Sequence, residues 1–129
     1  MNKRVLGTAT FLGMLSVILG AYGAHGLEKL VDSESVDTFN TGVEYQMYHA
    51  LLLMMVGMTN FLSHKSKQII FYLVVLGILF FSGSIYGLST NELSGFDFKT
   101  IAFITPIGGL LLIASWAMLL IKFLQYKKD

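Results

Sequence analysis

The chain has 129 residues, of which 54% are apolar and 13% are charged, a balance that is unusual for a soluble domain of this size. Its apolar residues form four runs of about 16 to 21 residues without acid or base, each long enough to cross a bilayer as a helix, so little chain remains for a soluble catalytic, nucleotide-binding or nucleic-acid-binding domain. The absence of cysteine excludes disulfides, thiolate metal ligands and thiol nucleophiles, and the formal net charge of +1 gives no general attraction to nucleic acid.

The first apolar run extends from Val5 to Ala24 and follows two basic residues, Lys3 and Arg4. A secretory signal peptide begins in a similar way, but its apolar region is usually shorter than this run. We therefore predict a first transmembrane helix over residues 5–25.

The second apolar run covers Met47–Leu62, and the helix that contains it is expected to begin earlier. Ser33 or Ser35 is placed to cap a first turn, and apolar residues with helical spacing lead from there into the run. These residues are Val36, Phe39, Val43, Met47, Ala50 and Met54. The pattern predicts a helix over 35–62 that either extends out of the membrane at its start or bends at Gly42.

Two further apolar runs, Ile69–Ser89 and Ile101–Ile121, predict transmembrane helices over 69–89 and 101–123. The segments that separate the four runs are short and polar. The predicted fold class is an all-α integral membrane protein, in which residues 1–129 form one domain, a compact bundle of four transmembrane helices.

Basic residues accumulate on one side of this topology. The side with both termini holds seven of them, Lys3, Arg4, Lys65, Lys67, Lys122, Lys127 and Lys128, whereas the other side holds Lys29 and Lys99. Short loops rich in Lys and Arg stay in the cytoplasm. We therefore predict a multi-pass protein of the bacterial inner (cell) membrane with cytoplasmic N- and C-termini.

Small residues indicate where helices approach one another, because contact between helices in lipid depends on close packing. The first helix carries a stripe of small residues at spacings of three and four, which predicts that this helix lies at the centre of the bundle. Helix-packing positions are expected at Gly13, Ser16, Gly20, Gly23, Gly83, Gly87, Pro106, Gly108 and Gly109.

Polar residues within the apolar runs, or close to them, concentrate on the side away from the termini. The candidate polar cluster consists of His25, Glu44, Tyr45, Tyr48, His49, Ser82, Ser84, Tyr86 and Thr105, with Gln46 among them on the second helix. Pro106 should leave the carbonyl of Ala102 without its helical donor and so expose it to the cluster. We expect His25 and His49 to face the bundle interior, because a histidine in hydrocarbon would lack hydrogen-bond partners.

Three interpretations of this cluster remain open. In the first, the cluster is structural, and its polar groups form hydrogen bonds with one another that fix the helix packing. In the second, Glu44, His25 and His49 form an ion or proton site. In the third, the same three residues bind a metal. No close histidine pair supports the metal, and no acid near mid-membrane orients a histidine for catalysis. We predict no catalytic residues, no metal and no cofactor. Trp116 is interpreted as an interfacial anchor.

Four ordered motifs resemble those of a known family. They are Gly20 to Leu27 (GAYGAHGL), Thr41 to Ala50 (TGVEYQMYHA), Phe80 to Tyr86 (FFSGSIY) and Thr105 to Gly109 (TPIGG). The chain resembles the domain of unknown function 423 family of small bacterial membrane proteins, which is related to animal transmembrane protein 256. The resemblance implies a four-helix inner-membrane protein without an established activity, and Glu44 stands where the family tends to have glutamine.

The predicted function is that of a non-enzymatic membrane protein, acting in membrane integrity or as an accessory subunit. The predicted partners are membrane lipid and either further copies of the chain or another membrane protein, without nucleic acid. The alternative is a small transporter or channel for an ion, a proton or a small solute that enters at the candidate polar cluster. A transporter needs a continuous polar path, and the half of the chain nearer the termini has no comparable set of polar residues.

Overall fold

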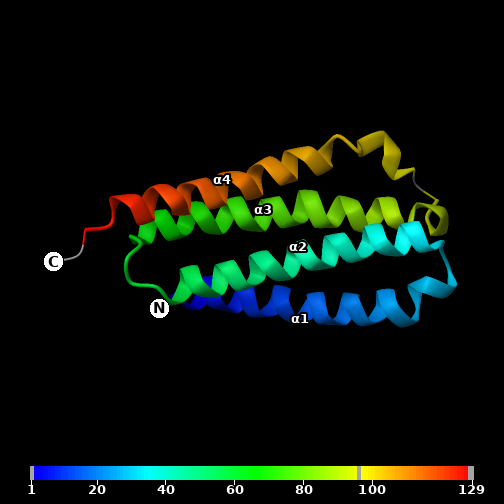
Figure 1. Cartoon of the computed structure of the whole chain (residues 1–129), viewed down its shortest axis with the longest axis horizontal. Coiled ribbons are helices and arrows are strands. Elements are labelled where there is room, and N and C mark those ends of the chain that lie inside the picture. The colour runs from blue at the N-terminus through cyan, green and yellow to red at the C-terminus, as the bar shows by residue number, and fades with distance from the viewer. Residues whose placement is uncertain (1, 96, 128–129) are drawn as a thin grey trace.

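The computed structural model describes residues 2–95 and 97–127, which form an antiparallel up-and-down arrangement of four long helices (Figure 1). They are α1 (Lys3–His25), α2 (Ser33–Met58), α3 (His64–Ser89) and α4 (Ile104–Gln125), and short 3-10 turns lie at Leu27–Lys29, Asn91–Leu93 and Phe98–Ile101. α1 begins and α4 ends at the same end of the bundle, which we call the terminal end. We call the opposite end the loop end.

Short polar residues set where the first three helices begin. Asn2 accepts a hydrogen bond from the Val5 backbone N–H at 3.1 Å, and Asp32 accepts one from the Ser35 N–H at 2.8 Å. Ser63 caps α3 in the same way, through the Ser66 N–H at 3.1 Å. Each cap satisfies a donor that the first helical turn leaves free. Hydrogen bonds from Ser35 also hold the pKa of Asp32 below its usual value.

Several predicted boundaries are corrected by these caps. α2 begins at residue 33 with Asp32 as its cap, and not with Ser33 or Ser35. α3 begins at His64, five residues before the apolar run, because Ser63 starts the helix within the basic segment. α2 ends at Met58, and α4 begins at Ile104. α2 is a continuous helix through Gly42.

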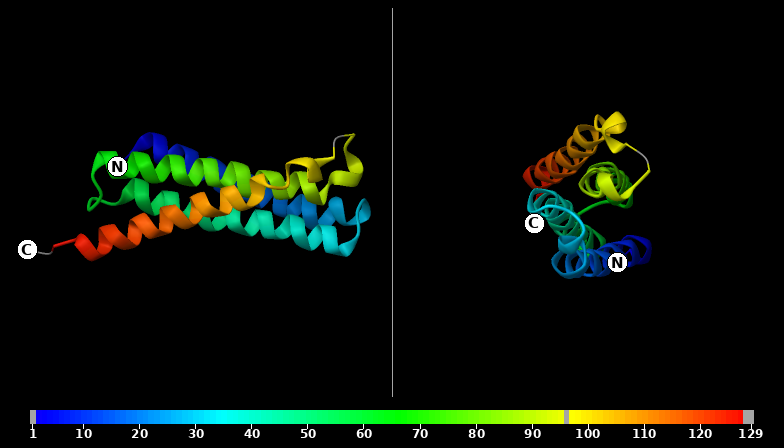
Figure 2. Two further views of the ribbon diagram at one scale, coloured as in Figure 1. Left: turned by 90° about the horizontal axis from the view of Figure 1, so that it is seen from above. Right: turned by 90° about the vertical axis from the view of Figure 1, so that its right-hand side faces the viewer.

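The two central helices are α2 and α3, whereas α1 packs mainly on α2 and α4 mainly on α3 (Figure 2). The prediction that the first helix is central is therefore wrong. The small residues of α1 fit it against a single neighbour, and large apolar side chains cover the rest of its surface. These are Phe11, Met14, Val17 and Ile18, with between 54% and 62% of each side chain exposed.

Exposed large apolar side chains lie on all four helices. Three segments are long and apolar enough to cross a membrane, namely Lys3–Lys29, His64–Ser89 and Ile104–Gln125. α2 is less apolar because its first half carries Glu34, Asp37 and Glu44, but it packs between α1 and α3 as part of the same bundle. The predicted all-α membrane fold is confirmed.

Helix approach is closest between α3 and α4. A Cβ at Gly108 would contact the backbone nitrogen of Phe81 and would lie 2.9 Å from the carbonyl oxygen of Gly77. Only a residue without a side chain allows these backbones to meet so closely. Gly109 is less tightly placed, since its Cβ would lie 3.6 Å from the Phe81 ring.

The other expected packing positions differ among themselves. On α1, Ser16 and Gly23 are buried, whereas a Cβ at Gly13 or Gly20 would have ordinary contacts at 3.9 and 3.5 Å. Gly87 packs against the ring of Phe98, where a Cβ would lie 2.6 Å away.

Two of the expected positions, Gly83 and Pro106, do not serve packing. Both residues are exposed, and a Cβ at Gly83 would have nothing within 4 Å. The regular spacing of small residues therefore includes positions that face outward.

Candidate functional site

The most buried polar side chain of α2 is Gln46, which lies near the middle of the helix and is 2% exposed. Its Nε2 donates to the carbonyl oxygen of Leu12 on α1 at 2.9 Å, and its Oε1 accepts from the Tyr86 hydroxyl on α3 at 2.7 Å. A single amide therefore joins three helices. A buried amide with both ends occupied fixes the relative position of the groups that it joins.

A second bond between α2 and α3 lies beside the first. The Ser82 hydroxyl is fully buried and donates to the carbonyl oxygen of Gly42 at 2.7 Å. The Tyr86 ring covers the same glycine, where a Cβ would lie 2.8 Å from the ring carbon Cε1. Gly42 therefore serves the close approach of two helices. We refer to Gln46, Ser82 and Tyr86 as the three-helix network.

His49 is 4% exposed and connects α2 to α4. The Trp116 indole N–H donates to His49 Nε2 at 3.0 Å, while His49 Nδ1 lies 2.7 Å from the carbonyl oxygen of Tyr45. An indole nitrogen only donates, so Nε2 must accept and Nδ1 must carry the proton that is donated to Tyr45. Both ring nitrogens are therefore occupied within the chain.

A third connection joins α3 to α4 through the hydroxyls of Ser84 and Thr105, which hydrogen-bond to each other. Ser84 also donates to the Phe80 carbonyl oxygen at 2.6 Å. The carbonyl of Ala102 is not left bare, because it accepts from the Thr105 N–H at 3.2 Å. Pro106 lies in the first turn of α4, where a helix has no need of its missing N–H, and this corrects the prediction of a freed carbonyl.

The remaining members of the candidate polar cluster lie on the surface. His25, Glu44, Tyr45 and Tyr48 are exposed. The expectation of an inward-facing histidine therefore holds for His49 and is wrong for His25. Gly23 faces the neighbouring helix, and a residue two positions further is turned roughly 200° around a helix axis, so His25 points away from the bundle.

The structure does not bring His25, Glu44 and His49 together. Within residues 2–95 and 97–127, no group of three or more His, Asp or Glu side chains is arranged to hold a metal ion. Tyr45 does reach the contact between helices, since its ring centre lies 5.0 Å from that of Phe81 on α3.

Two important residues were not recognised from the sequence: Gln46 was noted among the polar residues of the second helix without a role of its own, and Trp116 was interpreted only as an anchor. Gln46 has a detectable signal, because it belongs to a helical repeat of buried positions that runs through Phe39, Gly42, His49 and Leu53. Trp116 has none, because a half-exposed tryptophan resembles an interfacial anchor and its bond to His49 depends on how α4 is placed.

An apolar groove separates α2 from α4 beside the His49–Trp116 bond. Its volume is about 480 Å³, and it is lined by Tyr48, Leu51, Leu52, Met55, Trp116, Leu119, Leu120 and Phe123. Towards the terminal end the stacked rings of Phe61 and Phe123 lie with their centres 4.6 Å apart. A surface of this composition suits hydrocarbon, either an acyl chain or an apolar side chain of another membrane helix.

The comparisons with known proteins agree with this architecture. The family model described as "Protein of unknown function (DUF423)" matches residues 19–109. A UPF0382 membrane protein of Staphylococcus haemolyticus is 39% identical over 113 residues, which cover 88% of each chain. The UPF0382 membrane protein YwdK of Bacillus subtilis is 40% identical over 88% of this chain and 89% of its own.

A further relative is described as an inner membrane protein, the UPF0382 protein YgdD of Escherichia coli, with 36% identity over 98% of this chain and 94% of its own. No solved structure matches the chain significantly. The four motifs, the helical membrane fold and these similarities along most of the chain lead to one conclusion: the protein belongs to the DUF423 family of membrane proteins.

Proposed function

We propose that the protein is a non-enzymatic component of the bacterial inner membrane that acts in membrane integrity or as an accessory subunit of a larger membrane assembly. One observation carries the proposal: the buried polar groups of the candidate site bond to one another and to backbone carbonyls across helices. Groups used in this way hold the bundle together, and they present few free donors or acceptors to a substrate.

The proposed orientation places both termini in the cytoplasm. The fold brings the start of α1 and the end of α4 to the same end, and six of the eight Lys and Arg residues in the described part of the chain belong to that end. The positive-inside rule assigns such an end to the cytoplasm. The inner-membrane location is supported by the description of the Escherichia coli relative.

The proposed partners are lipid, further copies of the chain or another membrane protein. Exposed large apolar side chains occur on every helix, and the groove between α2 and α4 offers a concave apolar surface in the terminal half of the bundle. Such surfaces associate through close packing when they meet a complementary helix, and otherwise they are covered by lipid.

The alternative function, a transporter or channel, is less well supported by the packing. Between the three-helix network and the terminal end, apolar side chains form the core of the bundle. Among them are Ala9, Leu53, Val56, Val74 and Leu112, which are between 0% and 4% exposed. A polar solute entering at the loop end would have to cross this core, at the cost of losing its hydration.

Proteoliposomes test the proposal against its alternative. The full chain is reconstituted at a fixed density, and proton and potassium fluxes are followed with trapped indicators under an imposed gradient. We expect fluxes equal to those of protein-free vesicles. A flux that depends on the protein and is abolished by Gln46→Leu or His49→Leu, with both variants still folded, would establish the transporter instead.

A second experiment tests membrane integrity directly. Cells of a bacterium that lacks its own family member are exposed to a membrane-perturbing alcohol, and entry of an impermeant dye is measured. We expect the wild-type chain to restore the barrier. The Gln46→Leu variant at equal membrane abundance should restore it less well, while the Gln125→Leu variant, altered at an exposed position, should act like the wild type. Equal dye entry with and without the protein would refute a role in integrity.

A further inference from the structure

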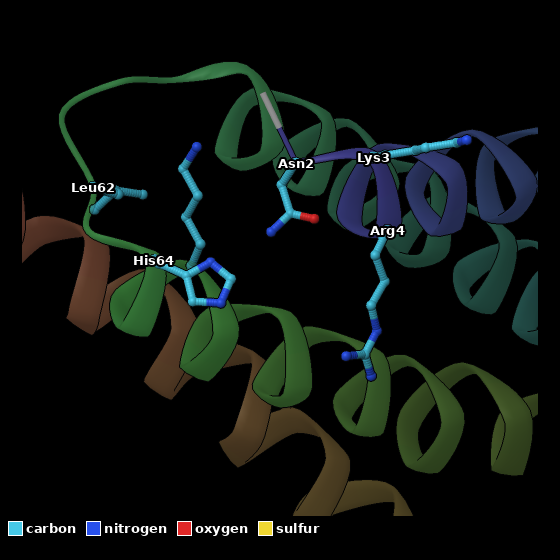
Figure 3. Close-up of a pocket in the computed structure, with 6 residues that line it drawn as sticks. Asn2, Lys3, Arg4, Leu62 and His64 are labelled. Atoms are coloured by element: carbon cyan, nitrogen blue, oxygen red, sulfur yellow. The ribbon is translucent and has the colours of Figure 1, made fainter.

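A basic cavity of about 420 Å³ lies at the terminal end, where α1 and α3 begin (Figure 3). Its lining consists of Asn2, Lys3, Arg4, Leu62, His64 and Lys67. Four of these six residues carry basic side chains and none is acidic. Figure 3 shows Asn2 and Arg4 on the α1 side of the opening, facing Leu62 and His64 across it.

Lys67 is the unusual member of this set, because it is only 8% exposed. It belongs to the inward face of α3, in helical register with the buried residues Ile70, Phe71 and Val74. No hydrogen bond or ion pair joins its ammonium group to the described residues. The side chain is therefore packed along most of its length, while its ammonium group reaches the open cavity. A lysine held in this way favours a ligand that brings negative charge.

The acidic residues in the described part of the chain do not supply that charge. The seven that lie in the described part of the chain are on the loop side, in the connections there and in the first half of α2: Glu28, Asp32, Glu34, Asp37, Glu44, Glu92 and Asp97. All seven lie in the loop half of the bundle, whereas the basic cavity lies at the terminal end.

Arg4 is held in place by aromatic residues and not by an acid. Its guanidinium donates to the Tyr72 hydroxyl at 2.7 Å and lies 5.1 Å from the ring centre of Phe71. Stacking and one hydrogen bond orient the group while its charge stays uncompensated and its other N–H donors remain available. The first turns of α1 and α3 add the positive ends of two helix dipoles at the same place.

We propose that this cavity binds the phosphate of an anionic phospholipid headgroup. The depth fits a lipid, because the exposed apolar surface of α3 begins immediately beyond the cavity, at Ile69 and Tyr72. Lys67 and Arg4 would donate hydrogen bonds to the phosphodiester, and the acyl chains of the same lipid would lie against that surface. The inference concerns whichever leaflet contains the terminal end, so it holds independently of the proposed function and orientation.

The test uses the purified full chain in a zwitterionic detergent, with short-chain phosphatidylglycerol as the probe. Binding is measured by native mass spectrometry and by the shift in thermal unfolding. Phosphatidylcholine with the same acyl chains and inorganic phosphate are the comparison ligands. We expect tighter binding and stabilisation with phosphatidylglycerol, and weak effects with the other two.

Two single substitutions separate the cavity from general electrostatics. Lys67→Gln should weaken phosphatidylglycerol binding by about five- to tenfold, the loss expected for one close cation. Lys65→Gln removes the same charge from an exposed position two residues away and should leave binding nearly unchanged. Lys67→Arg, which keeps the charge, should retain binding and shows that a variant at this position folds.

Three outcomes would overturn the proposal. Equal binding of phosphatidylcholine would show that the acyl chains alone are recognised. Equal losses in Lys67→Gln and Lys65→Gln would show a diffuse charge effect. Binding of inorganic phosphate as tight as that of phosphatidylglycerol would identify a soluble phosphate as the ligand. None of these results depends on whether the protein transports ions or supports the membrane barrier.

Discussion

Replacing Gln46 with leucine removes the amide that joins α1, α2 and α3 while keeping a side chain of similar size. The Leu12 carbonyl loses one of its donors but keeps another, the Ser16 hydroxyl at 2.9 Å. The loss of this one interhelical hydrogen bond should lower the free energy of unfolding by about 0.6 kcal/mol. The Tyr86 hydroxyl loses its bond to Gln46 and is left without this acceptor, which costs about 1 to 3 kcal/mol. The free energy of unfolding should therefore fall by about 1.5 to 3.5 kcal/mol.

Reversible unfolding of the chain in mixed micelles measures this change, with Gln125→Leu as a control at an exposed position. The double variant Gln46→Leu, Tyr86→Phe provides a sharper criterion. Removing both partners leaves no stranded hydroxyl, so the double variant should be less destabilised than the sum of the two single variants by about 1 kcal/mol or more. Additive losses, or a Gln46→Leu variant as stable as the wild type, would show that the bond does not hold the helices.

The remaining predictions concern α4, helix contact and topology. His49→Leu should lower the stability by about 1 to 3 kcal/mol, because it strands the indole N–H, whereas His49→Gln should cost less; fluorescence of the single tryptophan should change with the first variant. Gly108→Ala should cost about 1 to 3 kcal/mol by forcing two backbones apart, and Gly13→Ala should be nearly neutral in the same thermal assay. In intact cells an impermeant thiol reagent should label a cysteine that replaces exposed Glu34 but not one that replaces exposed Lys65; the opposite pattern would reverse the orientation.

The number of helices and their membrane character were predictable from the sequence because both depend on local properties. Length and apolar content decide whether a segment spans a bilayer, and no knowledge of its neighbours is needed. The position of α1 depends on its neighbours. A stripe containing Ser16 and Gly23 shows that one face of α1 packs closely, but it does not show how many helices surround it. For this reason the sequence predicted a central helix, and the structure has a peripheral one.

The polar residues of the candidate site show the same limit at the level of single side chains. His25 and His49 are the same residue type at a similar predicted depth in the membrane, so both were predicted from the sequence to face the interior. Burial separates them, because α2 is covered on two sides and α1 on one. The useful signal is the register with neighbouring buried positions. Gln46 follows Gly42 by four residues and precedes His49 by three, which marks it as an interior residue even without coordinates.

Lys67 illustrates how a small error in a helix boundary hides a chemical feature. Counting basic residues treats Lys65 and Lys67 as two equal charges in a cytoplasmic loop. The cap at Ser63 places both in the first turns of α3, where two residues along the chain correspond to opposite sides of the helix. One lysine is then exposed, and the other joins the face that continues into the apolar core. A lysine packed against the core therefore follows from one capping residue, and its ammonium group is one of the positive charges on which the proposed lipid site depends.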